Sequence, residues 1–352
     1  MPWPKTKGKE THLTDPNREK CRVSSCYISY HREDFSKSDA VVFHGSAMPT
    51  NRRLSSILWR KPKGQKWAWY SAENPETIGS YSYIKSMNDM FDITITYRRD
   101  STVFEPYGYY KVIQSSPNSE EVIQQVHNMN AKKDRLLLWH VSNCDPLLRL
   151  SLVKAIAKYI HVDVYGRCQK YFNQRGVCGR WSQSCDTWSK RYKFYLAFEN
   201  YNCKDYVTEK YWNNALARNV VPVVVAGSYN KDIMIPGSYI DILDFPNAES
   251  LAKYLIYLDS NKTAYDEYFE WKKKYTVVPE SNWLCDLCET LHQNSSGSQR
   301  LWDLGKFWGT EHCHADDLYI ENVWLKSSGT NSKYWTTIIL AFHLLIQFAI
   351  EC

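Results

Sequence analysis

The second half of the chain alternates short apolar runs with longer amphipathic segments. The short runs predict strands at residues 136–141, 162–165, 193–198 and 220–225. The longer segments predict helices at residues 146–160, 207–217 and 248–258. Because strands joined through helices pair in parallel, with helices on both faces, this pattern predicts an α/β domain. Ligands of such a sheet bind at the carboxyl ends of its strands.

The first half of the chain predicts a second unit. Strands are expected at residues 40–43, 67–70 and 91–97, and helices at residues 55–60 and 80–90. With 352 residues, the chain is long enough for two domains that each bury a core. A polar stretch over residues 115–135 predicts the boundary between them. The expected organisation is an N-terminal tail (1–20), a first domain (21–130), a second domain (131–315) and a C-terminal tail (316–352).

The composition argues against two classes of protein. Charged residues make up 23% of the chain and aromatic residues 15%, which is typical of a globular protein and not of a disordered one. The net charge of +6 permits an anionic ligand. No basic run is interleaved with aromatic residues, so nucleic acid is not expected as a partner.

Eleven cysteines predict a protein of an oxidising compartment. This odd number leaves at least one thiol unpaired. The CxxC at residues 285–288 has zinc binding as an alternative, but its nearest further ligands form an irregular set: His312, Cys313 and His314. Disulfides are therefore favoured over zinc. Two candidate N-glycosylation sites, Asn261 and Asn294, also fit a secretory lumen.

The two chain ends differ in character. The N-terminal MPWPKTKGKE is basic, and neither a signal peptide nor an anchor is expected there. Residues 338–350, IILAFHLLIQFAI, are apolar except for His343 and Gln347, which would share one face of a helix. This segment is shorter than the roughly 20 residues that span a bilayer. Three alternatives stay open: a lipid-anchor signal, with residues 327–329 as its small-residue site, an amphipathic helix packed on the protein, and an aberrant chain end.

A polar segment separates two predicted strands in FYLAFENYNCKDYVTEKYWNNALARNVVPVVVAG, residues 194–227. The loop after the first strand would hold Glu199 and Asn200, and Asp205 would cap the helix that follows. Glu209 and Lys210 would then lie in the first turn, where free N–H groups and the helix dipole suit a phosphate. The alternative is a capped helix with a solvated charged turn.

This segment closely resembles the signature of the α1,3-fucosyltransferases. FYLAFEN, DYVTEKYWNNAL and VVPVVV occur here in the order of the family. Further blocks match the family in the same order: AVVFH (40–44), YRRDS (97–101), PYG (106–108), VSNC (141–144), VDVYG (162–166), SYIDI (238–242) and WLCDLC (283–288). The resemblance spans about residues 20–315, which is most of the chain.

The resemblance implies an α/β fold of two facing Rossmann-like domains, the GT-B type of glycosyltransferase. The first domain would handle the acceptor, and the second would bind GDP-fucose. The reaction would invert the anomeric centre and would need a base for the acceptor hydroxyl. The matching context Glu73-Asn-Pro75, which follows a predicted strand, places that base at Glu73.

The same resemblance assigns the donor site. Arg149 and Lys210 would serve the diphosphate leaving group. Three further residues would hold the ribose and the fucose: Asn200, Tyr206 and Glu209. No metal or other cofactor is expected to be required, and a divalent metal would at most stimulate the reaction. Arg99 and Asp100 are expected to be structural and to pair within the first domain.

The family also suggests cysteine pairing and a subtype. It often ties an N-terminal pair, here Cys21 and Cys26, to the C-terminal CxxC of Cys285 and Cys288, in an order that the sequence leaves open. Further cysteines resemble those of invertebrate glycoprotein 3-α-L-fucosyltransferases of the core type: Cys144, Cys168, Cys178, Cys185 and Cys203. The expected acceptor is therefore GlcNAc of glycoprotein N-glycans. The alternatives are a Lewis-type enzyme that acts on antennal GlcNAc, and a non-catalytic glycan- or nucleotide-binding relative.

The resemblance further implies a place in the Golgi lumen. Family members are usually held in the membrane by an N-terminal anchor, so membrane association is expected from the family although no such anchor is seen in the first ten residues. The oligomeric state is not indicated by the sequence.

Overall fold

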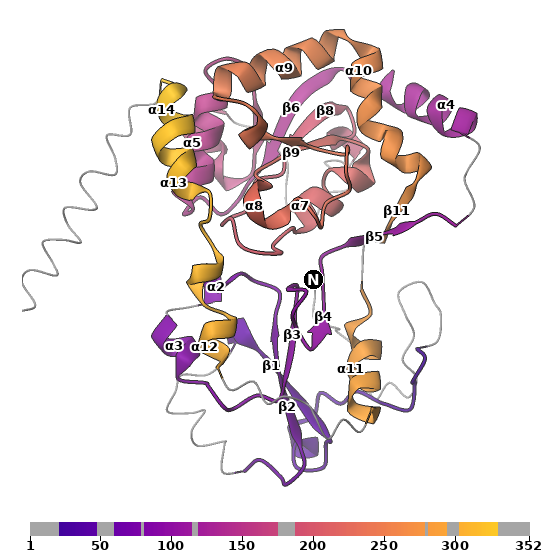
Figure 1. The fold of residues 1–352 in the computed structure, drawn as a ribbon, viewed down its shortest axis with the longest axis vertical. Helices are drawn as coiled ribbons and strands as arrows, with labels where there is room; N and C mark the ends of the chain where they lie inside the picture. Colours follow the sequence, from indigo (N-terminus) through magenta and orange to yellow (C-terminus); the bar gives the residue numbers. More distant parts are fainter. Residues whose placement is uncertain are drawn as a thin grey trace, which may run out of the picture.

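The protein consists of two α/β domains that face each other (Figure 1). The computed structural model describes residues 21–47, 60–78, 81–114, 119–174, 187–278, 281–293 and 303–329. Each domain is built on a parallel sheet. The expected pair of Rossmann-like domains is therefore confirmed.

The second domain holds a sheet of five strands in the order β10-β9-β8-β6-β7. The strands are β6 (Arg135–His140), β7 (Asp163–Tyr165), β8 (Tyr192–Leu196), β9 (Val221–Val224) and β10 (Ile240–Asp241). Counted along the chain, this is the doubly wound order 2-1-3-4-5, which reverses direction between β6 and β8. A ligand of this sheet is expected at the carboxyl ends of these two strands, where the loops diverge.

Both faces of this sheet are buried because successive side chains point to opposite sides. Leu137 and Trp139 of β6 pack in the cluster that includes α5 (Leu147–Ile156) and α9 (Ala248–Ser260). Leu138, between them, packs in the cluster on the other face, which includes α7 (Glu209–Trp212). The apolar runs of the sequence thus predicted these strands correctly.

The first domain holds four parallel strands in the order β1-β2-β3-β4. They are β1 (Ala40–His44), β2 (Lys66–Ser71), β3 (Ile93–Thr96) and β4 (Val103–Phe104). Two short helices, α2 (Pro75–Ile78) and α3 (Tyr81–Lys85), lie between β2 and β3 in the chain. The helix expected at residues 55–60 lies outside the described residues except for its last position.

Late segments of the chain return to the first domain. β11 (Tyr275–Val278) pairs antiparallel with β5 (Tyr109–Val112), which follows β4. Beyond this ribbon, α11 (Trp283–His292) contacts β4 and α12 (Leu304–Phe307) contacts α3 (Figure 1). The connection from β5 back to the second sheet runs through α4 (Ser119–Asn130), and α10 (Lys262–Asp266) follows α9.

The residues after 316 were expected to form a tail, but 317–327 fold onto the second domain. They comprise α13 (Asp317–Tyr319), a π-helical turn (Ile320–Trp324) and α14 (Leu325–Ser327). Trp324 is fully buried, and its indole nitrogen donates to the carbonyl of Ile242 at 3.1 Å. The apolar segment 338–350 lies outside the described residues. Within the described part of the chain, no helix is both long and apolar enough to cross a membrane.

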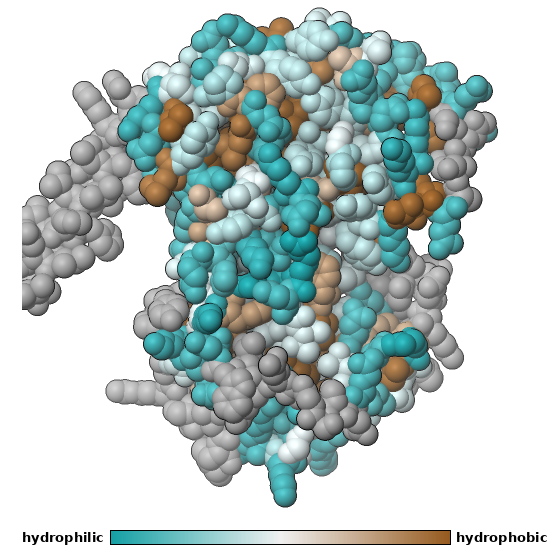
Figure 2. Space-filling model, in the orientation of Figure 1, coloured by the Kyte–Doolittle hydropathy of each residue, from teal (hydrophilic) through white to brown (hydrophobic). Residues whose placement is uncertain are grey.

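Four disulfides join described residues: Cys21–Cys285, Cys26–Cys288, Cys144–Cys168 and Cys203–Cys313. The first two are the family's expected ties between the chain's start and its CxxC. The zinc alternative for the CxxC is wrong here, because each of these sulfurs is bonded to another sulfur and is not a free thiolate. The face shown in Figure 2 is mostly hydrophilic, with hydrophobic side chains in small separate areas.

Candidate active site

Glu73 lies two residues after the end of β2, at the edge of the first sheet that faces the second domain. The side-chain oxygen of Asn74 accepts from the backbone N–H of Thr77 at 3.1 Å and so begins α2. The Ser71 hydroxyl donates to the Glu73 carbonyl at 2.8 Å. The half-buried Glu73 carboxylate accepts from the Tyr206 hydroxyl at 3.3 Å. The expected base of the first domain therefore meets an expected donor residue of the second.

Tyr206 is held in a cluster of aromatic rings between the domains. Its ring centroid lies 4.8 Å from that of Tyr97 and 6.1 Å from that of Tyr107. The Tyr107 hydroxyl donates to the carbonyl of Ala72 at 2.6 Å, next to Glu73. Burial raises the pKa of Tyr206 well above its ordinary value, and the nearby Tyr107 and Glu199 raise it further. Tyr206 therefore keeps its proton and donates it in the hydrogen bond to Glu73.

Arg149 lies where the order of the second sheet predicts a ligand. This residue of α5 is 6% exposed. Its guanidinium donates to the carbonyl of Asn143, in the loop after β6, and at 3.5 Å to the carbonyl of Phe198, in the loop after β8. Burial lowers the pKa of Arg149, which still stays charged at any physiological pH. Its Nε is buried with no hydrogen-bond partner among the described residues, which leaves a donor available at this point.

Lys210 supplies the second cation. Its Nζ donates to Glu199 Oε2 and to the Thr208 hydroxyl, both at 2.8 Å, and lies 3.3 Å from Glu209 Oε1. Burial alone would lower the pKa of Lys210, but the carboxylates of Glu199 and Glu209 outweigh burial and raise it. The ammonium is therefore charged and aligned before any ligand arrives.

Glu199 is a member of this site that the sequence reasoning did not assign. Its carboxylate accepts from the backbone N–H of Thr208 at 2.9 Å and from the hydroxyl of Thr208 at 2.8 Å. Burial and the Glu209 carboxylate raise the pKa of Glu199, against the opposing effect of Lys210. The pKa of Glu209 is lowered, because Lys210 outweighs its burial. The position of Glu199 at the end of a strand was the signal that could have identified it.

The helix expected at residues 207–217 is wrong in its start and length. α7 covers Glu209–Trp212, and Thr208 caps it by accepting from the Lys210 N–H. Asp205 has a φ of +61° and does not cap the helix. Four residues give a weak helix dipole, so the side chains carry the positive charge of this site and not the helix terminus.

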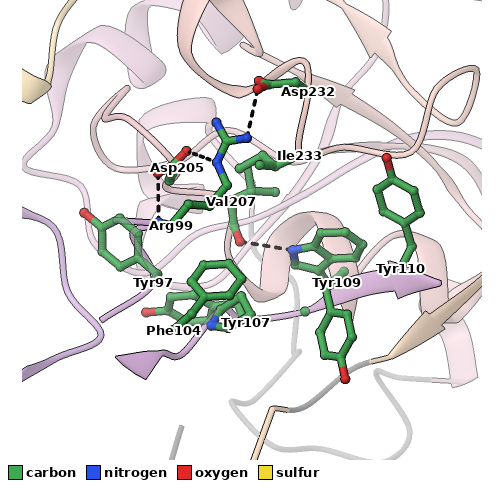
Figure 3. Close-up of a pocket in the computed structure, with 13 residues that line it drawn as sticks. Tyr97, Arg99, Phe104, Tyr107, Tyr109, Tyr110, Asp205, Val207, Asp232 and Ile233 are labelled. Atoms are coloured by element: carbon green, nitrogen blue, oxygen red, sulfur yellow. Dashed lines mark hydrogen bonds and ion pairs between the residues drawn. The ribbon is translucent and has the colours of Figure 1, made fainter. Parts of the chain in front are cut away.

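Asp205 instead binds Arg99 of the first domain. Arg99 Nε lies 3.0 Å from Asp205 Oδ1, the Arg99 backbone N–H donates to Asp205 Oδ2 at 3.1 Å, and Nη1 lies 2.9 Å from Asp232. Asp100 pairs with Arg98 at 2.5 Å. The expected pairing of Arg99 within the first domain is therefore wrong: Arg99 joins the two domains (Figure 3).

A pocket opens beside this interdomain contact (Figure 3). Its walls come from both domains: Tyr97, Arg99, Phe104, Pro106, Tyr107, Gly108, Tyr109, Tyr110, Asp205, Val207, Trp212, Asp232 and Ile233. Gly108 packs so closely on Trp212 that a Cβ would lie 2.6 Å from its ring, so the backbone itself forms part of the wall. The pocket does not include Glu73, Arg149 or Lys210, but it shares Tyr97 and Tyr107 with the cluster around Tyr206.

The remaining expected residues have mixed settings. Asn200 is half-buried in the loop after β8, next to Glu199. Asn261 begins α10, where its side chain accepts from the N–H of Ala264 at 3.1 Å and donates to the Tyr257 hydroxyl at 2.9 Å. Asn294 lies outside the described residues. Glycosylation of either asparagine stays a prediction.

Comparison with known proteins identifies the family. Residues 130–307 match the model described as glycosyltransferase family 10 (fucosyltransferase) C-terminal, and residues 1–108 match the fucosyltransferase N-terminal model. The chain is 33% identical over 315 residues to glycoprotein 3-alpha-L-fucosyltransferase A of Drosophila melanogaster, covering 87% of this chain and 58% of that relative. It is 35% identical over 282 residues to human 4-galactosyl-N-acetylglucosaminide 3-alpha-L-fucosyltransferase FUT6, covering 78% of this chain and 73% of the human one.

A solved structure is also similar. A crystal structure of α1,3-fucosyltransferase with GDP-fucose matches at 20% identity with a TM-score of 0.44, and the match covers 66% of this chain and 77% of that one. From the match to both family models, together with the 35% identity to the human relative over 73% of its length, this chain belongs to the family 10 fucosyltransferases.

Proposed function

We propose that the protein transfers L-fucose from GDP-β-L-fucose to GlcNAc of glycoprotein N-glycans, in an α1,3 linkage and with inversion. One observation carries this proposal. The Tyr206 hydroxyl of the second domain donates a hydrogen bond to Glu73 of the first, and Lys210 follows Tyr206 by four residues, in α7. A base and a pair of cations on opposite sides of a domain boundary are what an inverting transfer needs.

In the proposed reaction, Glu73 takes the proton of the acceptor hydroxyl as that oxygen attacks the anomeric carbon of fucose. The bond from this carbon to the β-phosphate oxygen breaks, and its electron pair leaves with GDP. Arg149 and Lys210 stabilise the charge that develops on the diphosphate. Because they supply the positive charge, a divalent metal would at most stimulate the reaction.

The donor contacts of the proposal use the loop after β8. Asn200, Tyr206 and Glu209 would hold the ribose and the fucose. Glu209 is 46% exposed, whereas Lys210 and Glu199 are 16% and 13% exposed, so the Glu209 carboxylate is the one open to a sugar hydroxyl. When the diphosphate binds Lys210, the carboxylate of Glu199 keeps its hydrogen bonds from Thr208 and holds the loop in place.

In this proposal the acceptor binds in the pocket beside Arg99, between the two domains. Four of its aromatic side chains are half-buried: Phe104, Tyr107, Tyr109 and Tyr110. Aromatic faces of this kind pack against the C–H groups of a pyranose, and Asp232, 65% exposed, can accept from its hydroxyls. The name of the Drosophila relative supports a glycoprotein acceptor, and that of the human relative supports the rival, an antennal acceptor.

Four disulfides support a lumenal setting, because structural disulfides persist in the secretory pathway and are rare in the cytosol. We infer that the protein acts in the Golgi lumen, in association with the membrane.

The test is fucose transfer by the purified, secreted protein. It is offered GDP-fucose with a core N-glycan peptide that exposes antennal GlcNAc, or with a LacNAc oligosaccharide, and mass spectrometry after glycosidase digestion locates the fucose. Glu73→Gln should lower kcat by about 10²–10⁴-fold and leave GDP affinity unchanged. Glu249→Gln, a surface glutamate paired with Lys253, is the matched control.

Each outcome of this test decides between the candidates. Transfer to the innermost GlcNAc supports the core type, and transfer to LacNAc alone supports the Lewis type. GDP binding without transfer to either acceptor supports the non-catalytic relative. Full activity of Glu73→Gln would show that another group is the base.

A further inference from the structure

The segment that follows the C-terminal family match binds the loop between β8 and α7, residues 197–208, which is called the donor loop here. The C-terminal family model ends at residue 307, and residues 310–317, called the clasp here, lie beyond it. Cys313 of the clasp forms a disulfide and an antiparallel bridge with Cys203. The Lys204 N–H donates to the His312 carbonyl at 2.8 Å, and the His314 N–H donates to the Asn202 carbonyl at 2.9 Å. The clasp therefore runs along residues 202–204, between Asn200 and Tyr206.

His314 extends this contact to the first domain. Its Nε2 lies 2.8 Å from Glu76 Oε1 and its Nδ1 lies 2.5 Å from Asp317 Oδ2. Glu76 belongs to α2 and follows the expected base by three residues, whereas Asp317 belongs to α13, on the second domain. The ring also packs edge-on against Tyr201 of the donor loop, with centroids 5.9 Å apart. One imidazole thus touches the segment of the base, the donor loop and α13.

The environment of His314 favours its charged form. The hydrogen bond with Asp317 and the hydrogen bond with Glu76 outweigh desolvation and raise the pKa of His314 to about 9. Glu321, on the next helical turn, and Tyr201 also face this group. With a protonated ring, both nitrogens donate to carboxylates, which neither neutral tautomer can do. His314 has a φ of +70°, in the left-handed region that few residues other than glycine adopt.

We propose that His314 is a positioning residue for fucosyl transfer, which sets the turn of Glu73 against the loop that carries Asn200 and Tyr206. This inference rests on the proposed function. The acceptor oxygen must approach the anomeric carbon within a narrow range of distances, and the base and the donor are held by different domains. A charged group that joins both segments keeps that separation fixed.

The experiment compares His314→Asn, Glu76→Gln and wild type. Asparagine tolerates a positive φ but cannot bridge two carboxylates, so the backbone survives while the bridge is lost. His161→Asn is the matched control. The exposed His161 ring pairs with a single carboxylate, that of Asp163 at 3.1 Å. Calorimetry measures the Kd of GDP, and steady-state transfer measures kcat and KM.

We expect His314→Asn to lower kcat by about tenfold to a hundredfold, because it frees the turn of Glu73, and to weaken GDP binding about threefold to tenfold, because it removes the ring that packs against Tyr201. Glu76→Gln should lower kcat about tenfold and leave the Kd of GDP within about twofold, because the donor loop keeps its clasp. His161→Asn should match wild type. A purely structural role would lower the melting temperature of His314→Asn and leave its kcat unchanged.

Two measurements separate this inference from the proposed function. The imidazole signal of His314 in NMR should titrate near pH 9 in the wild type and move toward pH 6.5 in Glu76→Gln and Asp317→Asn. Transfer by the wild type should fall as pH rises through 9, and this limb should be absent in His314→Asn. If the wild type transfers no fucose, the proposed function fails, and the titration with the GDP affinities still decides for or against the bridge. Titration near 6.5 in the wild type, or kcat of His314→Asn within twofold of wild type, would overturn it.

Discussion

Replacement of Arg99 by alanine tests the contact that joins the two domains away from the clasp. Arg99 pairs with Asp205 at 3.0 Å and with Asp232 at 2.9 Å. The two partners differ in their surroundings, because the Asp205 side chain is 1% exposed and that of Asp232 is 65% exposed. The variant therefore breaks one pair with a buried carboxylate and one pair in solvent.

The burial of Asp205 sets the size of the expected effect. Loss of one partner from a fully buried pair costs about 3–5 kcal/mol, because a charge is left without its partner. Arg99 is 44% exposed and its backbone N–H still donates to Asp205 after the change, so the expected loss falls to about 2 kcal/mol. The exposed pair with Asp232 should contribute less than about 1 kcal/mol.

Urea unfolding followed by tryptophan fluorescence measures these free energies. Arg99→Ala should lower the free energy of unfolding by about 2 kcal/mol, and Asp232→Asn should change it by less than about 1 kcal/mol. Asp205→Asn keeps a residue that tolerates the φ of +61° and serves as the matched removal of charge. A cost under about 0.5 kcal/mol for Arg99→Ala, or an equal cost for Asp232→Asn, would show that the buried Asp205 pair does not stabilise the protein.

Three further changes should have separate effects. Trp324→Ala should destabilise the protein by about 3–5 kcal/mol, because it empties a fully buried site, and an unchanged urea midpoint would contradict that packing. Lys210→Met should lower the free energy of unfolding by about 3 kcal/mol, because Glu199 loses its charged partner, and should abolish GDP binding, because a cation for the diphosphate is lost. Adding Glu199→Gln should restore stability but not binding, as measured by unfolding and calorimetry. Since the pKa of His314 is raised from 6.5 to about 9, its stabilisation should be complete below pH 6.5 and lost as pH rises through 9. The shift corresponds to about 3 kcal/mol, which 40% exposure reduces to about 1 kcal/mol, and a pH dependence that persists in His314→Asn would contradict this origin.

The strands of the sheets could be predicted because each one is a short run of apolar residues in the sequence. Runs such as residues 136–141 and 220–225 can be buried on both faces, and the observed β6 and β9 differ from them by at most one residue at each end. The roles given to Glu73 and Arg149 come from the resemblance to the family and stay predictions, and the contacts around these two residues were not predicted. That Tyr206 donates to Glu73 depends on how two domains dock, which no local pattern encodes.

The failed expectations share one physical cause. Aspartate is a common helix cap, but the Asp205 carboxylate is bound by Arg99, which lies 106 residues earlier in the chain. Residues 317–327 lack the long apolar run of a core helix, yet Ile320, Trp324 and Leu325 pack in the core of the second domain. In both cases a partner distant in sequence outweighed the local preference.

The disulfides of the first domain also determine when that domain can be completed. Cys21 and Cys26 must await Cys285 and Cys288, which leave the ribosome more than 260 residues later. The second domain also waits for late residues, because Cys203 pairs with Cys313 and Trp324 packs in the domain's core. Neither domain can therefore be completed before the late segments of the chain are made, and the early cysteines must be kept from wrong partners throughout translation.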